Sequence, residues 1–412
     1  MMLMMLMMED TNEYPKYAWD GGGGTEKKPS VRPVVSCKTE QGTGLQPVLD
    51  GVTLPLKAQD YIFKKIGIIK TDFALANFIL DTPLFVSKDP SLSICNTHIE
   101  GVPVRFYRPK PHRLLQRGVL FIHGGGGTTG SIASYDPLCR YLSKESDSVI
   151  LSIGYSLVPY QPYPVQYYQC LDVAIHFMKH AEEYGVDSSR VIIWGDSFGG
   201  LVAASVSQML IQKDGAPKLC AQVLVYPFLQ SVKHSLPSYM QNLNSPPLGK
   251  IGLVTLALKY IQKDVSLLEV ILQGAHVSKE VKAKYDKWLS KENLPEEFRG
   301  RETKARTSRG FSFGSMEELV DQLCGPLLSP LLVEDAIIRR LPDTFIMTCQ
   351  FDALRDDGVL YKKRLEDNGV PVTWCHLEDG FHGFLNFIIN TPFAFSICKE
   401  GADNMVNYIR RF

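Results

Sequence analysis

Residues 191–200 read VIIWGDSFGG and decide the fold of this chain. Residues 191–194 are bulky and apolar, which predicts a strand buried on both faces, and the apolar segment 201–211 predicts a buried helix after it. Between them, residues 195–199 have the pattern Gly-x-Ser-x-Gly. A serine at a sharp strand-to-helix turn needs small neighbours because its backbone is strained and closely packed. We therefore predict Ser197 as a nucleophile, rather than only as the cap of the helix.

The rest of the chain repeats this alternation of strand and helix. From about residue 118, short apolar runs are separated by longer segments of helical period, such as Val165–Ala181. The predicted strands are Val119–His123, Val149–Ile153, Val191–Trp194, Ala221–Tyr226, Thr344–Cys349 and Val372–His376. Strands that alternate with helices in this way predict an α/β fold with a mostly parallel, doubly wound central sheet flanked by helices.

Two regions interrupt the alternation. Residues from about 50 to 95 contain apolar helical segments, and residues from about 230 to 326 form an insertion between the fourth and fifth predicted strands. The insertion starts with an apolar helix candidate, Ile251–Ile261, and continues into the charged stretch Lys279–Arg309. An insertion of this length commonly serves as a lid over a site. We therefore predict one α/β domain over residues 49–412, with a helical cap built from both regions.

The composition is that of a folded, neutral protein. The 412 residues include 44 basic and 44 acidic side chains, and 45% of all residues are hydrophobic. A net charge of zero provides no field that would gather nucleic acid, which is therefore not an expected partner. The nine cysteines are scattered, with neither a Cys-x-x-Cys pair nor zinc-ligand spacing, and this predicts reduced thiols without a metal.

The N-terminal segment is apolar but short. Residues 1–8 read MMLMMLMM and are followed at once by Glu9 and Asp10. A helix needs about 20 residues to cross a bilayer, and the segment lacks the basic flank and cleavage site of a secretory signal. A run of glycines, Gly21–Gly24, and polar residues follow. We expect residues 1–48 to be disordered.

A second glycine-rich segment ends the first predicted strand. Residues 123–127 read HGGGG, and N–H groups without side chains in the way can approach an oxyanion closely. The rival interpretation is a dinucleotide-binding loop, Gly-x-Gly-x-x-Gly at 125–130, with Glu145 as the ribose ligand. That loop needs a helix starting at the glycines, whereas residues 128–130, Thr-Thr-Gly, start helices poorly. It also leaves residues 195–200 unexplained, so we favour the oxyanion site.

A serine nucleophile needs a base, and the base needs a carboxylate that orients it. In this type of sheet the chain order is serine, acid, histidine, with the last two after late strands. His382 lies in a loop between glycines and is a better base than His376, which falls inside a predicted strand. Asp352 follows a predicted strand directly, whereas Asp356 and Asp357 can be explained as acids in the first turn of a helix. We therefore predict His382 and Asp352.

Four motifs together resemble the hormone-sensitive lipase branch of the α/β-hydrolases, and more narrowly the arylacetamide deacetylase-like serine esterases. They are HGGGG at 123–127, GDSFGG at 195–200, FDALRDDG at 351–358 and EDGFHG at 378–383. The resemblance covers roughly residues 50–412 and implies an α/β-hydrolase fold. It also implies a helical cap that roofs an apolar acyl or aryl pocket.

The resemblance assigns roles to individual residues. It implies a catalytic triad of Ser197, Asp352 and His382. It implies oxyanion donors at the N–H groups of Gly124, Gly125 and Phe198. The remaining motif positions are His123, Gly126, Gly195, Asp196 and Gly199.

The predicted activity is two-step acyl transfer through an acyl-enzyme on Ser197, without a metal or an organic cofactor. The expected partner is a small apolar ester or amide, with arylacetamides and acylglycerol lipids among the candidates. The alternative is a non-catalytic protein of the same fold that binds a small hydrophobic ligand, although all three triad positions are filled. The family resemblance implies association with the endoplasmic reticulum membrane. No anchor is visible in the chain, and a cytoplasmic location is the alternative.

Overall fold

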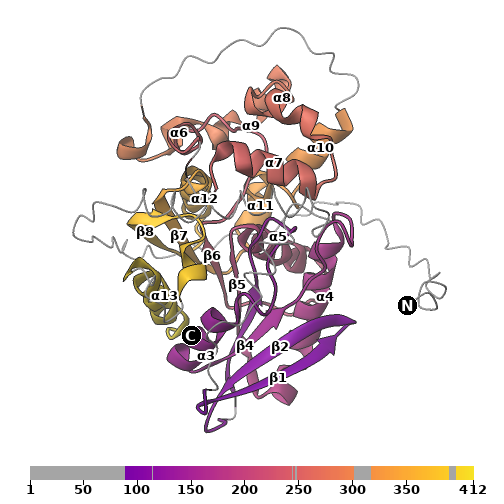
Figure 1. The fold of residues 1–412 in the computed structure, drawn as a ribbon, viewed down its shortest axis with the longest axis vertical. Helices are drawn as coiled ribbons and strands as arrows, with labels where there is room; N and C mark the ends of the chain where they lie inside the picture. Colours follow the sequence, from indigo (N-terminus) through magenta and orange to yellow (C-terminus); the bar gives the residue numbers. More distant parts are fainter. Residues whose placement is uncertain (1–88, 114, 244, 246–247, 301–316, 389–395) are drawn as a thin grey trace, which may run out of the picture.

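The computed structural model describes residues 89–412 except 114, 244, 246–247, 301–316 and 389–395. The described residues form a sheet of eight strands flanked by helices (Figure 1), in the order β1-β2-β4-β3-β5-β6-β7-β8. The strands are β1 (Leu92–Ile99), β2 (Val102–Pro109), β3 (Gln116–Ile122), β4 (Ser148–Ile153), β5 (Val186–Asp196), β6 (Ala221–Val225), β7 (Asp343–Phe351) and β8 (Val372–Phe381).

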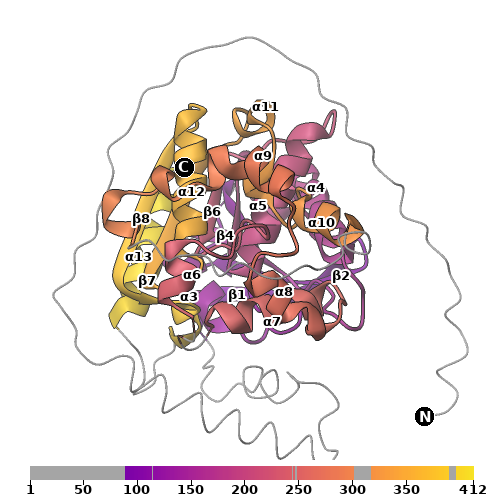
Figure 2. The same cartoon turned by 90° about the horizontal axis from the view of Figure 1, so that it is seen from above.

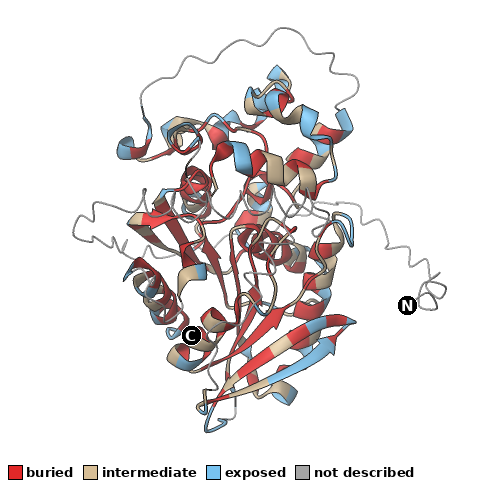
Figure 3. Ribbon diagram, in the orientation of Figure 1, coloured by how far each residue is buried: buried red, intermediate tan, exposed pale blue. Residues whose placement is uncertain are grey.

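The six predicted strands correspond to β3 through β8, and the predicted α/β sheet is confirmed. Each neighbouring pair in the series β4-β3-β5-β6-β7-β8 is parallel. Successive side chains of β3 point into two separate cores, because Leu120 and Ile122 belong to one apolar cluster and Val119 and Phe121 to the other. The central strands are therefore buried on both faces (Figure 3), as their nearly continuous apolar sequences predict.

Helices cover both faces of the sheet. The helices α3 and α13 pack in the cluster that contains Val119, whereas α4, α5 and α12 pack in the cluster that contains Leu120. Their bounds are α3 (Asp136–Ser146), α4 (Val165–Lys179), α5 (Phe198–Gln212), α11 (Asp335–Ile338), α12 (Arg355–Asp367) and α13 (Ser396–Ile409). The sheet therefore sits in the middle of a three-layer arrangement.

The first two strands form an antiparallel hairpin that our sequence analysis missed. Residues 92–95, which we assigned to the predicted cap, lie in β1, and residues 50–88 of that predicted cap segment lie outside the described residues. The hairpin turns at Glu100 and Gly101, whose φ angles are 50° and 74°, as a two-residue turn requires. β1 is an edge strand with mostly exposed or half-buried residues, so it lacks the apolar run that marks the other strands.

The predicted insertion separates β6 from β7 and contributes a layer of helices above the sheet (Figure 1). Seen from above in Figure 2, these helices lie across the strands. They are α6 (Pro237–Gln241), α7 (Lys250–Tyr260), α8 (Leu268–Leu272), α9 (Lys279–Leu289) and α10 (Glu317–Cys324). α7 matches the apolar helix predicted there, and α9 occupies the start of the charged stretch.

Two expectations concern the cellular compartment. Among the described residues, every helix is too short or too polar to cross a bilayer. The apolar segment 1–8 and the predicted disorder of residues 1–48 lie outside the described residues, so membrane association stays a prediction from the family resemblance. The described cysteines, from Cys95 to Cys398, are not joined by disulfide bonds, and the reduced state of the thiols stays a prediction.

Candidate active site

Ser197 lies at the sharp turn between β5 and α5. β5 ends at Asp196 and α5 begins at Phe198, so only the serine separates the two elements. Its φ and ψ angles are 54° and −118°, a sparsely populated conformation that costs about 1–3 kcal/mol. The Ser197 N–H donates to the carbonyl of Val225 at 2.9 Å, and this bond fixes the turn against β6. The strand, turn and helix predicted from the sequence are all present.

The glycines on either side of Ser197 allow a close backbone approach. A Cβ atom on Gly199 would lie 2.0 Å from the carbonyl oxygen of Ile122, at the end of β3. A Cβ atom on Gly195 would lie 2.1 Å from the carbonyl oxygen of Gly199. Real Cβ atoms do not approach backbone this closely, so both positions require glycine for this turn to form.

The three predicted triad residues form a continuous chain of hydrogen bonds. Ser197 Oγ lies 2.9 Å from His382 Nε2, and His382 Nδ1 lies 3.0 Å from Asp352 Oδ2. The second oxygen of Asp352 accepts the N–H of Leu354 at 2.8 Å, which holds the carboxylate in place. Asp352 and His382 follow the ends of β7 and β8, so two neighbouring parallel strands bring them together at one edge of the sheet.

Two opposing effects set the pKa of His382. Burial lowers the pKa, because the charged imidazolium is poorly solvated. The charge of Asp352, its hydrogen bond and the charge of Asp196 together raise the pKa by more than burial lowers it. The net result is a raised pKa, which means that the site stabilises a protonated His382. A histidine with this environment can take a proton from a serine hydroxyl and hold it while a tetrahedral intermediate exists.

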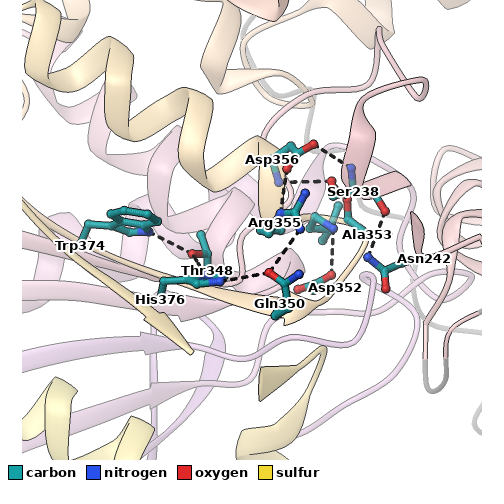
Figure 4. A network of polar contacts seen from close by, with 11 residues as sticks. Ser238, Asn242, Thr348, Gln350, Asp352, Ala353, Arg355, Asp356, Trp374 and His376 are labelled. Atoms are coloured by element: carbon teal, nitrogen blue, oxygen red, sulfur yellow. Dashed lines mark hydrogen bonds and ion pairs between the residues drawn. The ribbon is translucent and has the colours of Figure 1, made fainter. Parts of the chain in front are cut away.

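The alternative base, His376, has other partners. It lies inside β8, and its Nε2 is 3.3 Å from the side-chain oxygen of Gln350 (Figure 4), whereas Ser197 Oγ is bonded to His382. Burial and the positive charge of Arg355 lower its pKa to about 4. His376 is therefore a neutral, hydrogen-bonded strand residue, as we expected for it.

The glycine loop after β3 requires one correction. The N–H of Gly124 donates to Asp196 Oδ1 at 2.9 Å, so the predicted oxyanion role of Gly124 is wrong: this donor is already occupied by a buried carboxylate. Within the described part of the chain, no backbone hydrogen bond uses the N–H of Gly125 or Gly126. The N–H of Phe198 is also available, since the first N–H groups of a helix have no partner inside the helix. The available donors are those of Gly125, Gly126 and Phe198.

Asp196 has a structural role that its place in the motif did not reveal. Its carboxylate is 1% exposed and accepts hydrogen bonds from the N–H of Gly124 and from the hydroxyls of Tyr135 and Tyr226, at 2.9, 2.9 and 3.2 Å. Burial raises the pKa of Asp196 to about 6, although these donors oppose the rise. Asp196 thus ties the glycine loop to the turn at Ser197. No spacing rule connects these residues in the sequence.

His123 also helps to hold the glycine loop at residues 124–127 in place. Its Nδ1 donates to the carbonyl of Gly124 at 2.8 Å, and its own carbonyl accepts the hydroxyl of Tyr155 at 2.8 Å. Burial lowers the pKa of His123 to about 4, so the ring is neutral at physiological pH. The histidine and tyrosine rings also stack, with 4.2 Å between their centroids. His123 therefore orders the loop and has no contact with Ser197.

The rival interpretation of the loop as a dinucleotide site fails on geometry. Residues 124–130 form turns, and the next helix, α3, begins only at Asp136. A dinucleotide loop would place its glycines directly at a helix N-terminus. Within the described ranges, no cluster of three or more His, Cys, Asp or Glu side chains has the arrangement of a metal site.

An apolar cavity adjoins Ser197 and is roofed by the insertion. It encloses about 490 Å³ of empty space, part of which is open to solvent. The polar side-chain groups in its lining are the hydroxyls of Ser197, Ser231 and Tyr260. The other lining residues are Gly126, Phe198, Leu201, Phe228, Leu248, Leu253, Leu256, Ala257, Ile261, Leu323 and Leu328. A carbonyl group at Ser197 would thus have an apolar space beside it.

Comparison with known proteins agrees with this architecture. The family model described as "alpha/beta hydrolase fold" matches residues 119–269 and 293–386. A solved structure with a similar fold is a thermostable esterase from Pseudomonas putida, which has a TM-score of 0.62 and 19% sequence identity and matches 90% of this chain and 98% of its own. The fold and the family model therefore place the chain in the α/β-hydrolase class.

Relatives with higher sequence identity identify the family within this class. Arylacetamide deacetylase-like 4 from Homo sapiens is 39% identical over 352 residues, which cover 85% of each chain. Neutral cholesterol ester hydrolase 1 from Mus musculus is 36% identical over 333 residues, covering 78% of this chain and 80% of its own. The chain therefore belongs to the arylacetamide deacetylase-like family of α/β-hydrolases, and it is a serine ester hydrolase.

Proposed function

We propose that Ser197, His382 and Asp352 form the catalytic triad and hydrolyse a carboxylic ester through an acyl-enzyme. The observation that carries this proposal is the relay of 2.9 and 3.0 Å contacts that starts at a strained serine beside an apolar cavity. His382 Nε2 takes the Ser197 proton as Oγ attacks the carbonyl carbon, and Asp352 stabilises the imidazolium. His382 then protonates the departing alcohol, and a water molecule attacks the acyl-enzyme by the same route to release the acid.

The negative charge on the carbonyl oxygen needs donors that are in place before the reaction. We assign this role to the N–H groups of Gly125, Gly126 and Phe198, because the N–H of Gly124 is bonded to Asp196. Gly126 and Phe198 line the cavity together with Ser197, so their backbones adjoin the reacting carbon. One such donor contributes a factor of about 10²–10³ in kcat in comparable sites.

The cavity supports a small apolar ester as the substrate. Its lining offers no charged side chain, so a charged acyl group placed there would lose its hydration without compensation. The mouse relative is named a neutral cholesterol ester hydrolase, and the human relative is named for its likeness to arylacetamide deacetylase. From the apolar lining, we propose that this chain acts on uncharged esters whose apolar part fills the cavity under α7.

Labelling with a fluorophosphonate probe tests the proposal against the alternative of a non-catalytic binding protein. We expect the native protein to be labelled on the peptide that contains Ser197, because the probe reacts with a serine that a nearby base activates. Mass spectrometry of the labelled peptides gives the position, and heat-denatured protein serves as the control and stays unlabelled. Absence of labelling, or labelling of a different serine, would contradict the assignment of the triad.

A substitution in the roof of the cavity tests where the apolar part of the substrate binds. Ala257 lines the cavity from α7, so Ala257→Phe fills part of the space. We expect the ratio of kcat/KM for p-nitrophenyl octanoate to that for p-nitrophenyl acetate to fall at least tenfold. Excluding two methylene groups costs about 1.6 kcal/mol, and 1.4 kcal/mol corresponds to a factor of roughly ten.

The matched control for this change is Thr255→Phe. Thr255 lies on the same helix, and its hydroxyl donates to the carbonyl of Ile251 at 2.8 Å outside the cavity lining. The same bulky side chain is therefore added without filling the cavity, and the ratio of kcat/KM values should stay as in the original protein. An equal fall in both variants would show that the cavity is not the binding site.

A further inference from the structure

A buried ion pair lies beside the proposed catalytic acid and takes no part in the triad. Asp356 Oδ1 accepts the Nε of Arg355 at 2.9 Å, and both side chains are almost completely buried. The other oxygen of Asp356 accepts the N–H of Ser238 at 2.7 Å (Figure 4). We had explained Asp356 as an acid that stabilises the first turn of its own helix. Its side chain instead binds the first turn of α6, in the insertion.

Ser238 also binds the loop that carries the proposed catalytic acid. Its hydroxyl donates to the carbonyl of Ala353 at 2.7 Å and accepts the N–H of Asp356 at 3.3 Å. Ala353 is the residue directly after Asp352, so a side chain from the insertion holds the peptide next to the catalytic carboxylate (Figure 4). Ser238 is fully buried, so these bonds are shielded from solvent.

Arg355 extends the connection to a second part of the insertion. Its guanidinium group lies 4.3 Å from the centroid of the Phe298 ring, in the short helix Glu296–Phe298. A terminal nitrogen of Arg355 also donates to the side chain of Gln350 on β7 at 3.4 Å. Burying an ion pair costs desolvation energy and often adds no net stability, so its placement here calls for another explanation.

Asp357 forms a parallel set of contacts one residue later. Its carboxylate accepts the N–H of Leu229 at 3.1 Å, the side-chain amide of Gln230 at 3.0 Å and the hydroxyl of Tyr239 at 3.1 Å. Leu229 and Gln230 lie where the chain leaves the sheet for the insertion, and Tyr239 lies in α6. The start of α12 therefore holds the base of the insertion through two adjacent carboxylates.

We propose that Ser238, together with the Arg355–Asp356 pair, positions the catalytic acid and couples its orientation to the seating of the insertion over the cavity. The inference rests on the proposed triad. Because Ser238 binds the peptide after Asp352, displacement of α6 shifts the Asp352 carboxylate away from His382. A misplacement of about 1 Å in such a site can lower the rate by a factor of about 10². Ser238 is thus a positioning residue that touches no reacting atom.

The pH dependence of activity distinguishes positioning from a purely structural role. His382 must be neutral to take the Ser197 proton, so kcat/KM rises as the pH passes upward through the pKa of His382 in the free enzyme. The charged and titratable groups that face His382 are Asp352, Asp196 and Tyr226. A weaker contact with Asp352 lowers the pKa of His382, and the acid limb of the profile then moves to lower pH.

The test compares Ser238→Ala with Ser238→Cys in the full chain. Fluorophosphonate titration of active sites normalises each rate to the folded fraction. For Ser238→Ala we expect kcat for p-nitrophenyl butyrate to fall about tenfold or more, with KM changed less than kcat and the acid limb at lower pH. Ser238→Cys keeps a weak donor of similar size, so its kcat and acid limb should lie between those of Ser238→Ala and the original protein. If Ser238→Ala fails to fold, the shift in Ser238→Cys decides the question.

The control is Ser205→Ala. Ser205 is also buried, and its hydroxyl donates to the carbonyls of Pro326 and Leu327 at the other end of the insertion. These bonds do not involve the loop that carries Asp352. The Ser205→Ala variant should keep the acid limb of its kcat/KM profile at the same pH as in the original protein. The inference is overturned if the Ser238 variants match Ser205→Ala in normalised kcat and acid limb, and the triad then still stands. Failure of the native protein to label at Ser197 would instead overturn the proposed function.

Discussion

Ser197→Ala is expected to lower kcat for p-nitrophenyl butyrate by about 10⁶, the size of the loss seen when the nucleophile of a comparable triad is removed. The reason is that, among the described residues, the hydroxyl bonded to His382 Nε2 is that of Ser197, whose Oγ lies 2.9 Å away. The oxyanion donors remain, so a small residual rate above that of water is expected. The measurement is initial-rate kinetics, with circular dichroism to show that the fold is retained.

A serine inside α5, the helix that follows Ser197, provides the matched control. The hydroxyl of Ser207 donates to the carbonyl of Ala203 at 2.8 Å, inside α5 and without contact to the triad. Ser207→Ala should therefore keep kcat within about twofold, because the lost hydrogen bond lies within the helix and does not touch the triad. Loss of such a bond costs only about 1 kcal/mol of stability, so the protein should stay folded. A rate for Ser197→Ala above one hundredth of the original, with Ser207→Ala unchanged, would be incompatible with Ser197 as the nucleophile.

Gly199→Ala is expected to have the largest effect on folding. The added Cβ would lie 2.0 Å from the carbonyl oxygen of Ile122, and that oxygen belongs to the backbone at the end of β3. Inserting a methyl group into a packed core costs about 1–3 kcal/mol when side chains can yield. Here the end of β3 or the start of α5 must move instead, so we expect a loss of at least about 3 kcal/mol in the free energy of unfolding.

Urea unfolding followed by tryptophan fluorescence measures this loss, together with the yield of soluble protein. Gly252→Ala is the matched control because Gly252 lies inside α7 and is exposed, and its nearest neighbour is a side chain at 3.3 Å. Alanine favours a helix over glycine by about 1 kcal/mol, so Gly252→Ala should be neutral or stabilising. An unfolding midpoint of Gly199→Ala equal to that of the control would refute the steric argument.

The sequence alone was sufficient where neighbouring residues in the chain determine the structure. The turn at Ser197 depends on a buried strand, two glycines and a buried helix that follow one another along residues 191–211, and all of these can be read directly. The exposed hairpin strand Leu92–Ile99 escaped prediction because an edge strand carries no apolar run. The only local sign of it is the dipeptide Glu100-Gly101, whose two positive φ angles form the turn.

The choice of oxyanion donors shows what the local sequence cannot provide. Any N–H of the glycine run could serve until the partner of each one is known. The parallel register pairs Ile122 of β3 with Gly195 of β5, and this places Gly124 beside the carboxylate of Asp196. Gly124 and Asp196 are 72 positions apart in the chain, and the hydrogen bond between them removes Gly124 from the available donors.

By itself, the sequence determined the α/β fold, the order of serine, acid and histidine, and the identity of the residues that we propose as the triad. These follow from apolar periodicity and from motifs that need only local geometry. The tertiary structure alone decided which N–H groups of residues 124–126 lack a partner among the described residues, how Asp196 orders the loop, and how Ser238 and Asp356 connect α6 to the loop of the proposed catalytic acid. Each of these depends on satisfying buried polar groups with partners distant in the chain, and such partners are fixed only when the sheet register and the insertion are in place.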